Sequence, residues 1–136
     1  MIIRLEFAAA DVVGHVELEI PSTGRARYEL VVSGAAVGPG FVVVRDPDLA
    51  PPRGRVLELR GDGIWTELTE ETVDEHWSFG LEAFGLRVDD PAEEIGERIA
   101  VGYDLEWEAV DRVQGDLLLG RETVAIDARG HLTRRR

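Results

Sequence analysis

The stretch that decides the fold is residues 99–108, which read IAVGYDLEWE. Large apolar side chains stand at every second position, and small or acidic residues stand between them. Successive side chains of a β-strand point to opposite faces, so this alternation predicts a strand with one buried face. The residues expected to face the interior are Ile99, Val101, Tyr103, Leu105 and Trp107, and those expected to face water are Asp104, Glu106 and Glu108.

The same period of two recurs on both sides of this stretch, and helical periodicity is almost absent. Turn-forming residues separate pairs of alternating segments. The clearest turn is Gly61-Asp62-Gly63, because an Asp-Gly step between such segments is a strong hairpin signal. The predicted hairpins join 16–20 with 28–32, 55–60 with 64–70, and 113–119 with 123–126.

Two segments depart from simple alternation. Between residues 77 and 88 the apolar set changes phase close to Gly80 and Gly85, which predicts a β-bulge that turns Phe84 inward. Residues 90–94, DPAEE, combine a capping aspartate, a proline at the first helical position and acids in the first turn. These features predict one short helical turn at 90–96.

About eight to ten strands are expected in total, with no repeat and no linker. An open sheet of that many strands would expose edges that aggregate, so we expect the sheet to close on itself. The chain is therefore predicted to be all-β, with residues 1–136 forming a single antiparallel barrel or flattened barrel.

Composition excludes several classes of function. The net charge of −12 opposes binding to nucleic acid or to an anionic membrane surface, and no run of apolar residues is long enough to cross a membrane. With no cysteine, the chain can form neither disulfides nor thiolate sites, and a cytoplasmic location is expected. The basic stretch 134–136 is expected to be a frayed terminus.

Few residues suggest catalysis or metal binding. The histidines, His15, His76 and His131, lie far apart without metal-ligand spacing, so neither a metal nor a cofactor is expected. His76 stands between a carboxylate and a tryptophan, which makes it a weak candidate for proton transfer, as is Tyr103.

The inward aromatic residues are the main functional hypothesis. Tyrosine and tryptophan combine an apolar body with one polar group, which suits a pocket that orients an apolar or amphipathic small molecule. The same side chains could equally fill the core. The predicted ligand-binding residues are Tyr28, Trp77, Phe79, Phe84, Tyr103 and Trp107.

Three stretches carry a resemblance to a known family: DEHWSFGLEAF at 74–84, YDLEWE at 103–108 and GDLLLG at 115–120. With these, the second half of the chain resembles uncharacterised actinobacterial proteins related to the lipocalin-like AttH and carotenoid hydratase (hydroxyneurosporene synthase) superfamily. The resemblance implies a lipocalin-like barrel, with some relatives acting on hydrophobic polyenes. The family's second barrel half has no counterpart here, so no catalytic residue is carried over.

The leading expectation is a barrel that binds an apolar or amphipathic small molecule. One alternative is a hydratase, isomerase or cyclase of a hydrophobic natural product, and another is a structural subunit without a ligand. A homodimer is expected because the relatives combine two barrel-like halves in one chain, and a lone half would leave apolar surface exposed.

Overall fold

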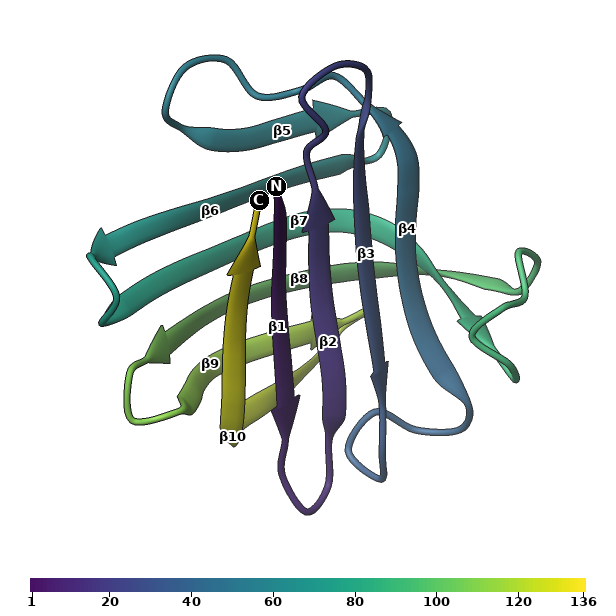
Figure 1. The fold of residues 1–136 in the computed structure, drawn as a ribbon. Helices are drawn as coiled ribbons and strands as arrows, with labels where there is room; N and C mark the ends of the chain where they lie inside the picture. Colours follow the sequence, from purple (N-terminus) through teal and green to yellow (C-terminus); the bar gives the residue numbers. More distant parts are fainter.

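The computed structural model describes residues 1–136 and contains ten β-strands and no helix (Figure 1). The all-β class and the expected number of strands are thereby confirmed. The strands are β1 (Ile2–Ala8), β2 (Val13–Glu19), β3 (Ala26–Ser33), β4 (Phe41–Leu49), β5 (Leu57–Gly61), β6 (Ile64–Thr72), β7 (His76–Val88), β8 (Glu97–Glu108), β9 (Arg112–Leu119) and β10 (Glu122–Arg135). No helix is present that could span a membrane.

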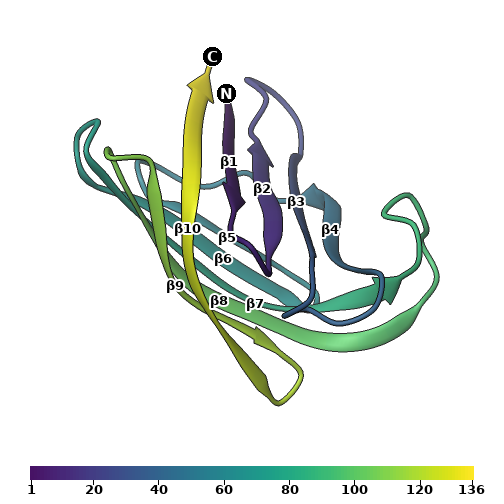
Figure 2. The same ribbon diagram turned by 90° about the horizontal axis from the view of Figure 1, so that it is seen from below.

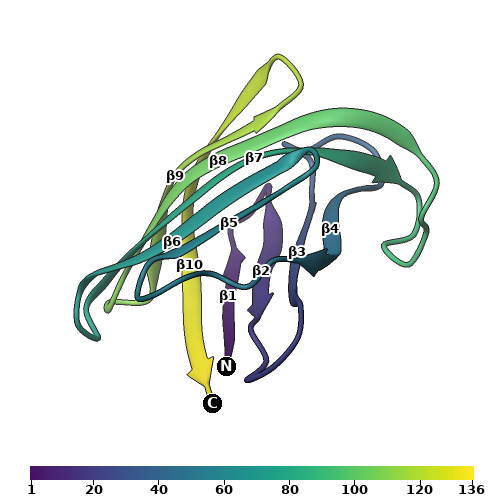
Figure 3. The same cartoon turned by 90° about the horizontal axis from the view of Figure 1, so that it is seen from above.

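The ten strands form one antiparallel sheet that folds over into two layers. We call the layer of β1 to β4 and the second half of β10 the N-sheet, and the layer of β5 to β9 and the first half of β10 the C-sheet (Figures 2 and 3). β10 joins the layers because its first half pairs with β9 and its second half with β1. The strands of the two layers cross at a wide angle (Figure 1).

The ring of strands closes where β4 meets β7, through residues 41–43 and 86–88. Eight strands, β1 to β4 and β7 to β10, therefore form a closed antiparallel barrel, and β6 and β5 continue the sheet outside it. The expected barrel is confirmed, and every neighbouring pair in the ring is antiparallel.

Gly85 makes this closure possible. A Cβ atom at Gly85 would lie 2.6 Å from the carbonyl oxygen of Val43, so only glycine lets β4 approach β7 this closely. The register between β7 and β8 runs without interruption from His76 to Arg87, so the predicted bulge is wrong. Gly85 occupies the inward position instead, and Phe84 points outward with 53% of its surface exposed. The predicted inward orientation of Phe84 is therefore also wrong.

The deciding stretch behaves as its alternation predicts. Tyr103, Leu105 and Trp107 are at most 8% exposed, and the acidic residues between them are exposed. The predicted Asp-Gly hairpin is likewise confirmed, since only Asp62 and Gly63 connect β5 to β6, and Gly63 has a φ of +75°.

Two other features differ from expectation. Residues 90–96 form a turn rather than a helix: the Asp90 carboxylate accepts from the Ala92 amide at 2.8 Å, and the Asp90 amide donates to the Glu93 carboxylate at 2.9 Å. Local capping chemistry is thus present, but no helix follows it. The expected fraying of 134–136 is not seen at Arg134 and Arg135, because β10 stays paired with β1 as far as Arg135, which lies opposite Ile2.

The core lies between the two layers as one cluster of thirty buried residues. Alternate positions of β1, β2 and β3 supply aliphatic side chains from the N-sheet, and β7 and β8 supply most of the aromatic ones from the C-sheet. Apart from two glycines, Thr66 is the only buried residue outside the apolar set, and its hydroxyl donates to the Gly80 carbonyl at 2.8 Å.

Candidate functional site

The predicted ligand-binding aromatics are packed inside the barrel, with the exception of Phe84. Tyr28, Trp77, Phe79, Tyr103 and Trp107 are each at most 8% exposed. The Trp77 and Phe79 rings stack with centroids 6.2 Å apart, and these contacts fill space between the layers. These five side chains form part of the packed core, and a role for them in ligand binding stays a prediction.

The two tyrosines link the layers through their hydroxyls. The Tyr28 and Tyr103 oxygen atoms lie 2.6 Å apart and form a buried hydrogen bond between β3 and β8. Burial raises the pKa of both hydroxyls well above the ordinary value, and for Tyr28 the neighbouring hydroxyl raises the pKa further. A phenol in this state holds its proton at neutral pH, which makes Tyr103 a poor proton-transfer group.

His76 lies on the outer side of the C-sheet. Its Nε2 atom forms a hydrogen bond of 2.9 Å with the Glu106 carboxylate on β8, and both side chains are partly exposed to solvent. The neighbouring Ser78 hydroxyl donates to a different carboxylate, that of Glu71, at 2.7 Å. His76 lines neither of the two large hollows of the molecule.

Both large hollows open on the outside of the barrel. The first, of about 620 Å³, lies on the N-sheet around the end of β1, the start of β2 and the middle of β10, and we call it the N-sheet hollow. The second, of about 840 Å³, lies across β6 to β9 and is called the C-sheet hollow. Both volumes fall in the range of small-molecule sites, so both outer faces offer accessible surface of a suitable size.

The N-sheet hollow has an apolar part and a polar part. The apolar part consists of Ala8, Val13, Val31 and Phe41, of which Val13 is 50% exposed. These residues occupy adjacent outward positions because β1 to β4 pair in regular register. Such a strip beside charged groups can receive a molecule with one apolar end.

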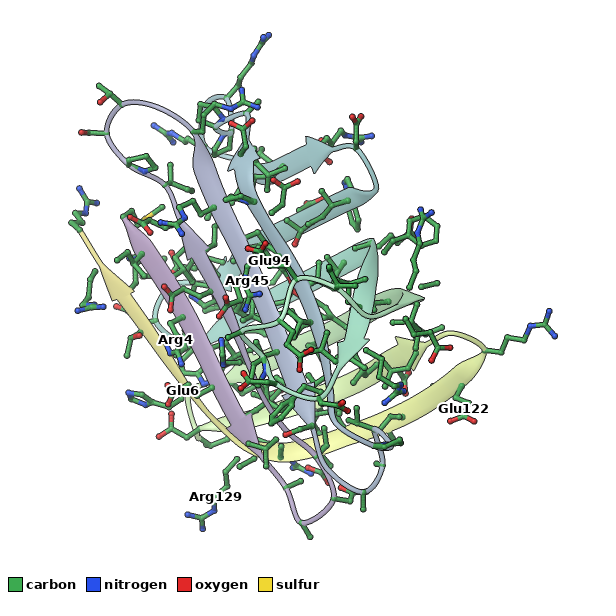
Figure 4. All side chains as sticks on the ribbon, turned by 90° about the vertical axis from the view of Figure 1, so that its right-hand side faces the viewer. Arg4, Glu6, Arg45, Glu94, Glu122 and Arg129 are labelled. Carbon is green, nitrogen blue, oxygen red and sulfur yellow. The ribbon has the colours of Figure 1, made fainter.

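The polar part results from strands that are far apart in the sequence. Glu6 of β1 pairs with His15 of β2 on one side and with His131 of β10 on the other. Arg4 and Arg129 border the same hollow, and Figure 4 shows Arg4, Glu6 and Arg129 along this side of the molecule. Sequence reasoning treated the histidines as isolated, because nothing in the sequence shows that residue 131 lies beside residue 6.

Most charges next to this hollow are already paired. Arg4 donates to Glu6 at 2.8 Å and also contacts Glu17, and the bond from Arg4 lowers the pKa of the Glu6 carboxyl. His15 Nε2 lies 2.8 Å from Glu29, which also accepts from Arg45 at 2.8 Å. Burial acts to raise the pKa of Glu29, but the bonds from His15 and Arg45 outweigh it and the pKa is lowered.

Arg129 is the exception at this hollow. It is exposed and forms no ion pair, whereas His131 lies 3.9 Å from Asp111. No group of three or more histidine, aspartate or glutamate side chains is arranged to hold a metal ion. The hollow therefore presents a free guanidinium and two imidazoles beside an apolar strip.

Comparison with known proteins adds no relative: no family model, no curated protein and no solved structure matches the chain. The resemblance to the AttH and carotenoid hydratase superfamily therefore stays a prediction, and function has to be inferred from the geometry of the outer hollows.

Proposed function

We propose that this protein binds an amphipathic small molecule with an anionic group, and that the N-sheet hollow is the binding site. The observation that carries the proposal is the unpaired Arg129 beside the exposed strip around Val13. A guanidinium binds carboxylate or phosphate in a bidentate manner, and the strip would cover the apolar end of the same molecule.

Two further observations support this site over the interior. The inward aromatics are packed against one another and their hydroxyls are paired, so an interior ligand would have to displace the core. The alternative of a hydratase, isomerase or cyclase draws no support from His76 or Tyr103, since one is paired on an open surface and the other is buried and protonated.

The core aromatics would report binding without touching the ligand. The Trp107 indole nitrogen donates to the Gly130 carbonyl at 3.2 Å, and Gly130 borders the hollow. A ligand that shifts the β10 main chain at this point changes the surroundings of Trp107. Its fluorescence should then change on binding.

The test uses decanoate and decanol, which share an alkyl chain and differ in charge. Titration below the micelle concentration, followed by calorimetry and tryptophan fluorescence, should show tighter binding of decanoate. Arg129→Gln should lower the affinity for decanoate by about tenfold and leave the affinity for decanol unchanged, since a hydrogen bond to a charged group contributes roughly 1.5–3 kcal/mol.

Val13→Glu should abolish binding of both molecules, because it places a carboxylate in the apolar strip. Val73→Glu is the matched control, since Val73 is 71% exposed in the turn between β6 and β7, away from the hollow. The proposal fails if neither molecule binds, if decanol binds as tightly as decanoate, or if Val13→Glu behaves as the control does.

A further inference from the structure

The C-sheet hollow has a different chemistry from the N-sheet hollow. Its outward side chains include Trp65 of β6, Phe84 of β7, Ala100 of β8 and Leu118 of β9. Phe84 is 53% and Leu118 45% exposed, so this apolar band is open to solvent. Isolated apolar residues on a surface are ordinary, but a contiguous band over four strands is typical of a contact surface.

Glycines make the band concave. The Trp65 ring lies over Gly80, where a Cβ atom would be 3.2 Å from the ring. The cross-strand row from Trp65 to Leu118 passes through Glu82 and Gly102, so it has no side chain beside Leu118, and the Glu82 carboxylate borders the groove. The result is a groove of about 840 Å³ that an inserted side chain could occupy.

An acidic row runs directly beside the apolar band. In cross-strand register it consists of Glu67, Gly80, Asp104 and Asp116. Asp104 and Asp116 are direct partners on β8 and β9, an arrangement in which like charges destabilise a sheet. None of the three acids takes part in an ion pair, and neither does Glu82 at the centre of the band.

The arginines nearest to this face do not neutralise it. Arg60 pairs with Glu58, and Arg112 forms two bonds to Asp127. The Arg98 guanidinium lies over the Phe84 ring, 4.1 Å from its centroid, at the end of the band away from the acidic row. The row of carboxylates therefore lacks a cationic partner within the chain.

We propose that the outer face of β6 to β9 docks an apolar segment of another protein that carries lysine or arginine. The apolar side chains of such a segment would enter the groove between Trp65 and Leu118, and its cations would lie against Asp104 and Asp116. Charge complementarity selects this occupant, since nucleic acid and anionic lipid would be repelled by the same row. A second copy of the chain would bring an equal row of acids against it.

The test uses a short peptide in which lysine alternates with tryptophan and leucine, and a matched peptide with glutamate in place of lysine. Amide shifts of the labelled full-length protein should concentrate at Trp65, Gly80, Gly102 and Leu118 when the lysine peptide is added. The affinity should fall with added salt, because part of the attraction between the peptide and the acidic row is screened.

Charge variants distinguish binding at this face from attraction to the net charge of the whole chain. Asp104→Asn with Asp116→Asn should lower the affinity for the lysine peptide by on the order of tenfold. Glu94→Gln with Glu122→Gln is the control: it removes the same charge at two exposed positions outside the hollow (Figure 4) and should leave the affinity nearly unchanged.

Three results would overturn the proposal. Equal binding of the two peptides would remove charge complementarity as the cause, and amide shifts outside β6 to β9 would place the contact elsewhere. A dimer mass in light scattering of the peptide-free protein, lost on Leu118→Glu, would assign the face to a second copy instead. None of these outcomes depends on the N-sheet hollow, so the two proposals can fail separately.

Discussion

The hydroxyl pair between Tyr28 and Tyr103 allows the sharpest test of how the two layers are held together. We consider Tyr28→Phe, Tyr103→Phe and the double variant, which remove hydroxyls without changing the packed rings. The bond is 2.6 Å long, and both residues are at most 3% exposed. A hydrogen bond of this kind contributes about 1 kcal/mol net, and a buried hydroxyl left without its partner costs a further ~1–3 kcal/mol.

Each single variant should therefore lower the free energy of unfolding by about 2 kcal/mol. The double variant leaves no unpaired hydroxyl, so it should be destabilised by no more than either single variant, and the two changes should be strongly non-additive. Urea unfolding followed by tryptophan fluorescence measures this, since about 2 kcal/mol moves the midpoint by roughly 1 M for an m-value of about 2 kcal/mol/M. Additive losses in the double variant would refute the idea that each hydroxyl depends on the other.

Stability and association offer four further tests. The chain has only two tyrosines and burial raises the pKa of both, so tyrosinate absorbance should be absent near pH 10 and should appear together with unfolding. The contribution of the tyrosines to the free energy of unfolding is full below the ordinary tyrosine pKa and is lost as the pH rises above it. Titration of a tyrosine while the protein is still folded would contradict this. Glu29 has a lowered pKa, so its contribution to the free energy of unfolding is full above the ordinary glutamate pKa of about 4.3 and is lost as the pH falls below it. Glu29→Gln should flatten this part of the pH dependence of stability, measured by urea unfolding. An unchanged pH dependence would argue against the network of Glu29 with His15 and Arg45. Gly85→Ala should lower the free energy of unfolding by about 1–3 kcal/mol in the same assay, because the Val43 carbonyl must move. Gly80→Ala is the control, since its new methyl group meets only the movable Trp65 ring and should cost less stability. Equal losses of stability in the two variants would contradict the role of Gly85 in closing the barrel. The homodimer inferred from the sequence stays a prediction: with a net charge of −12 per chain its association should strengthen with salt, and a monomer mass in light scattering at both low and high salt would count against it.

Strand positions could be predicted where alternation is long and uninterrupted. Residues 99–108 give their inward face directly, since a shift of one residue would bury Glu106 and expose Trp107. Phe84 was misplaced because the inward position next to it is a glycine, which leaves a gap in the apolar pattern. That glycine is required by the approach of β4, a contact between segments more than forty residues apart, and no local pattern records such a contact.

The helical turn predicted at 90–96 is wrong for a different reason, because here the local pattern is present but the rest of a helix is missing. The Glu93 carboxylate accepts from the Asp90 amide, as it would at the start of a helix, and the Asp90 carboxylate accepts from the Ala92 amide. A helix also needs further residues with a buried face, and here Ile95 is 87% exposed and Gly96 follows it. The cap therefore closes a turn, and Arg45 ties this turn to the N-sheet by donating to the Pro91 carbonyl at 3.0 Å.

The N-sheet hollow could not be assembled from the sequence, because it depends on which strands are neighbours. Glu6, His15 and His131 share a row only because β10 returns to pair with β1. That return also joins the two layers of the barrel, so a pairing on which the fold depends brings His131 beside Glu6. Predicting the number of strands was possible from local patterns, whereas predicting this row required their order around the barrel.

The contrast between the two outer faces gives the strongest reason to seek function there. Around the N-sheet hollow the other charged side chains are paired, as in the chain from Arg45 through Glu29 to His15, so Arg129 stands out there as free. On the C-sheet the acids Asp104 and Asp116 face each other without any cation, although an arginine at either position would relieve the repulsion. Sequences that violate a local rule without compensation within the chain tend to do so at functional sites. A cationic partner on this face would supply the missing compensation, and binding should then raise the stability of the barrel as well as cover its apolar band.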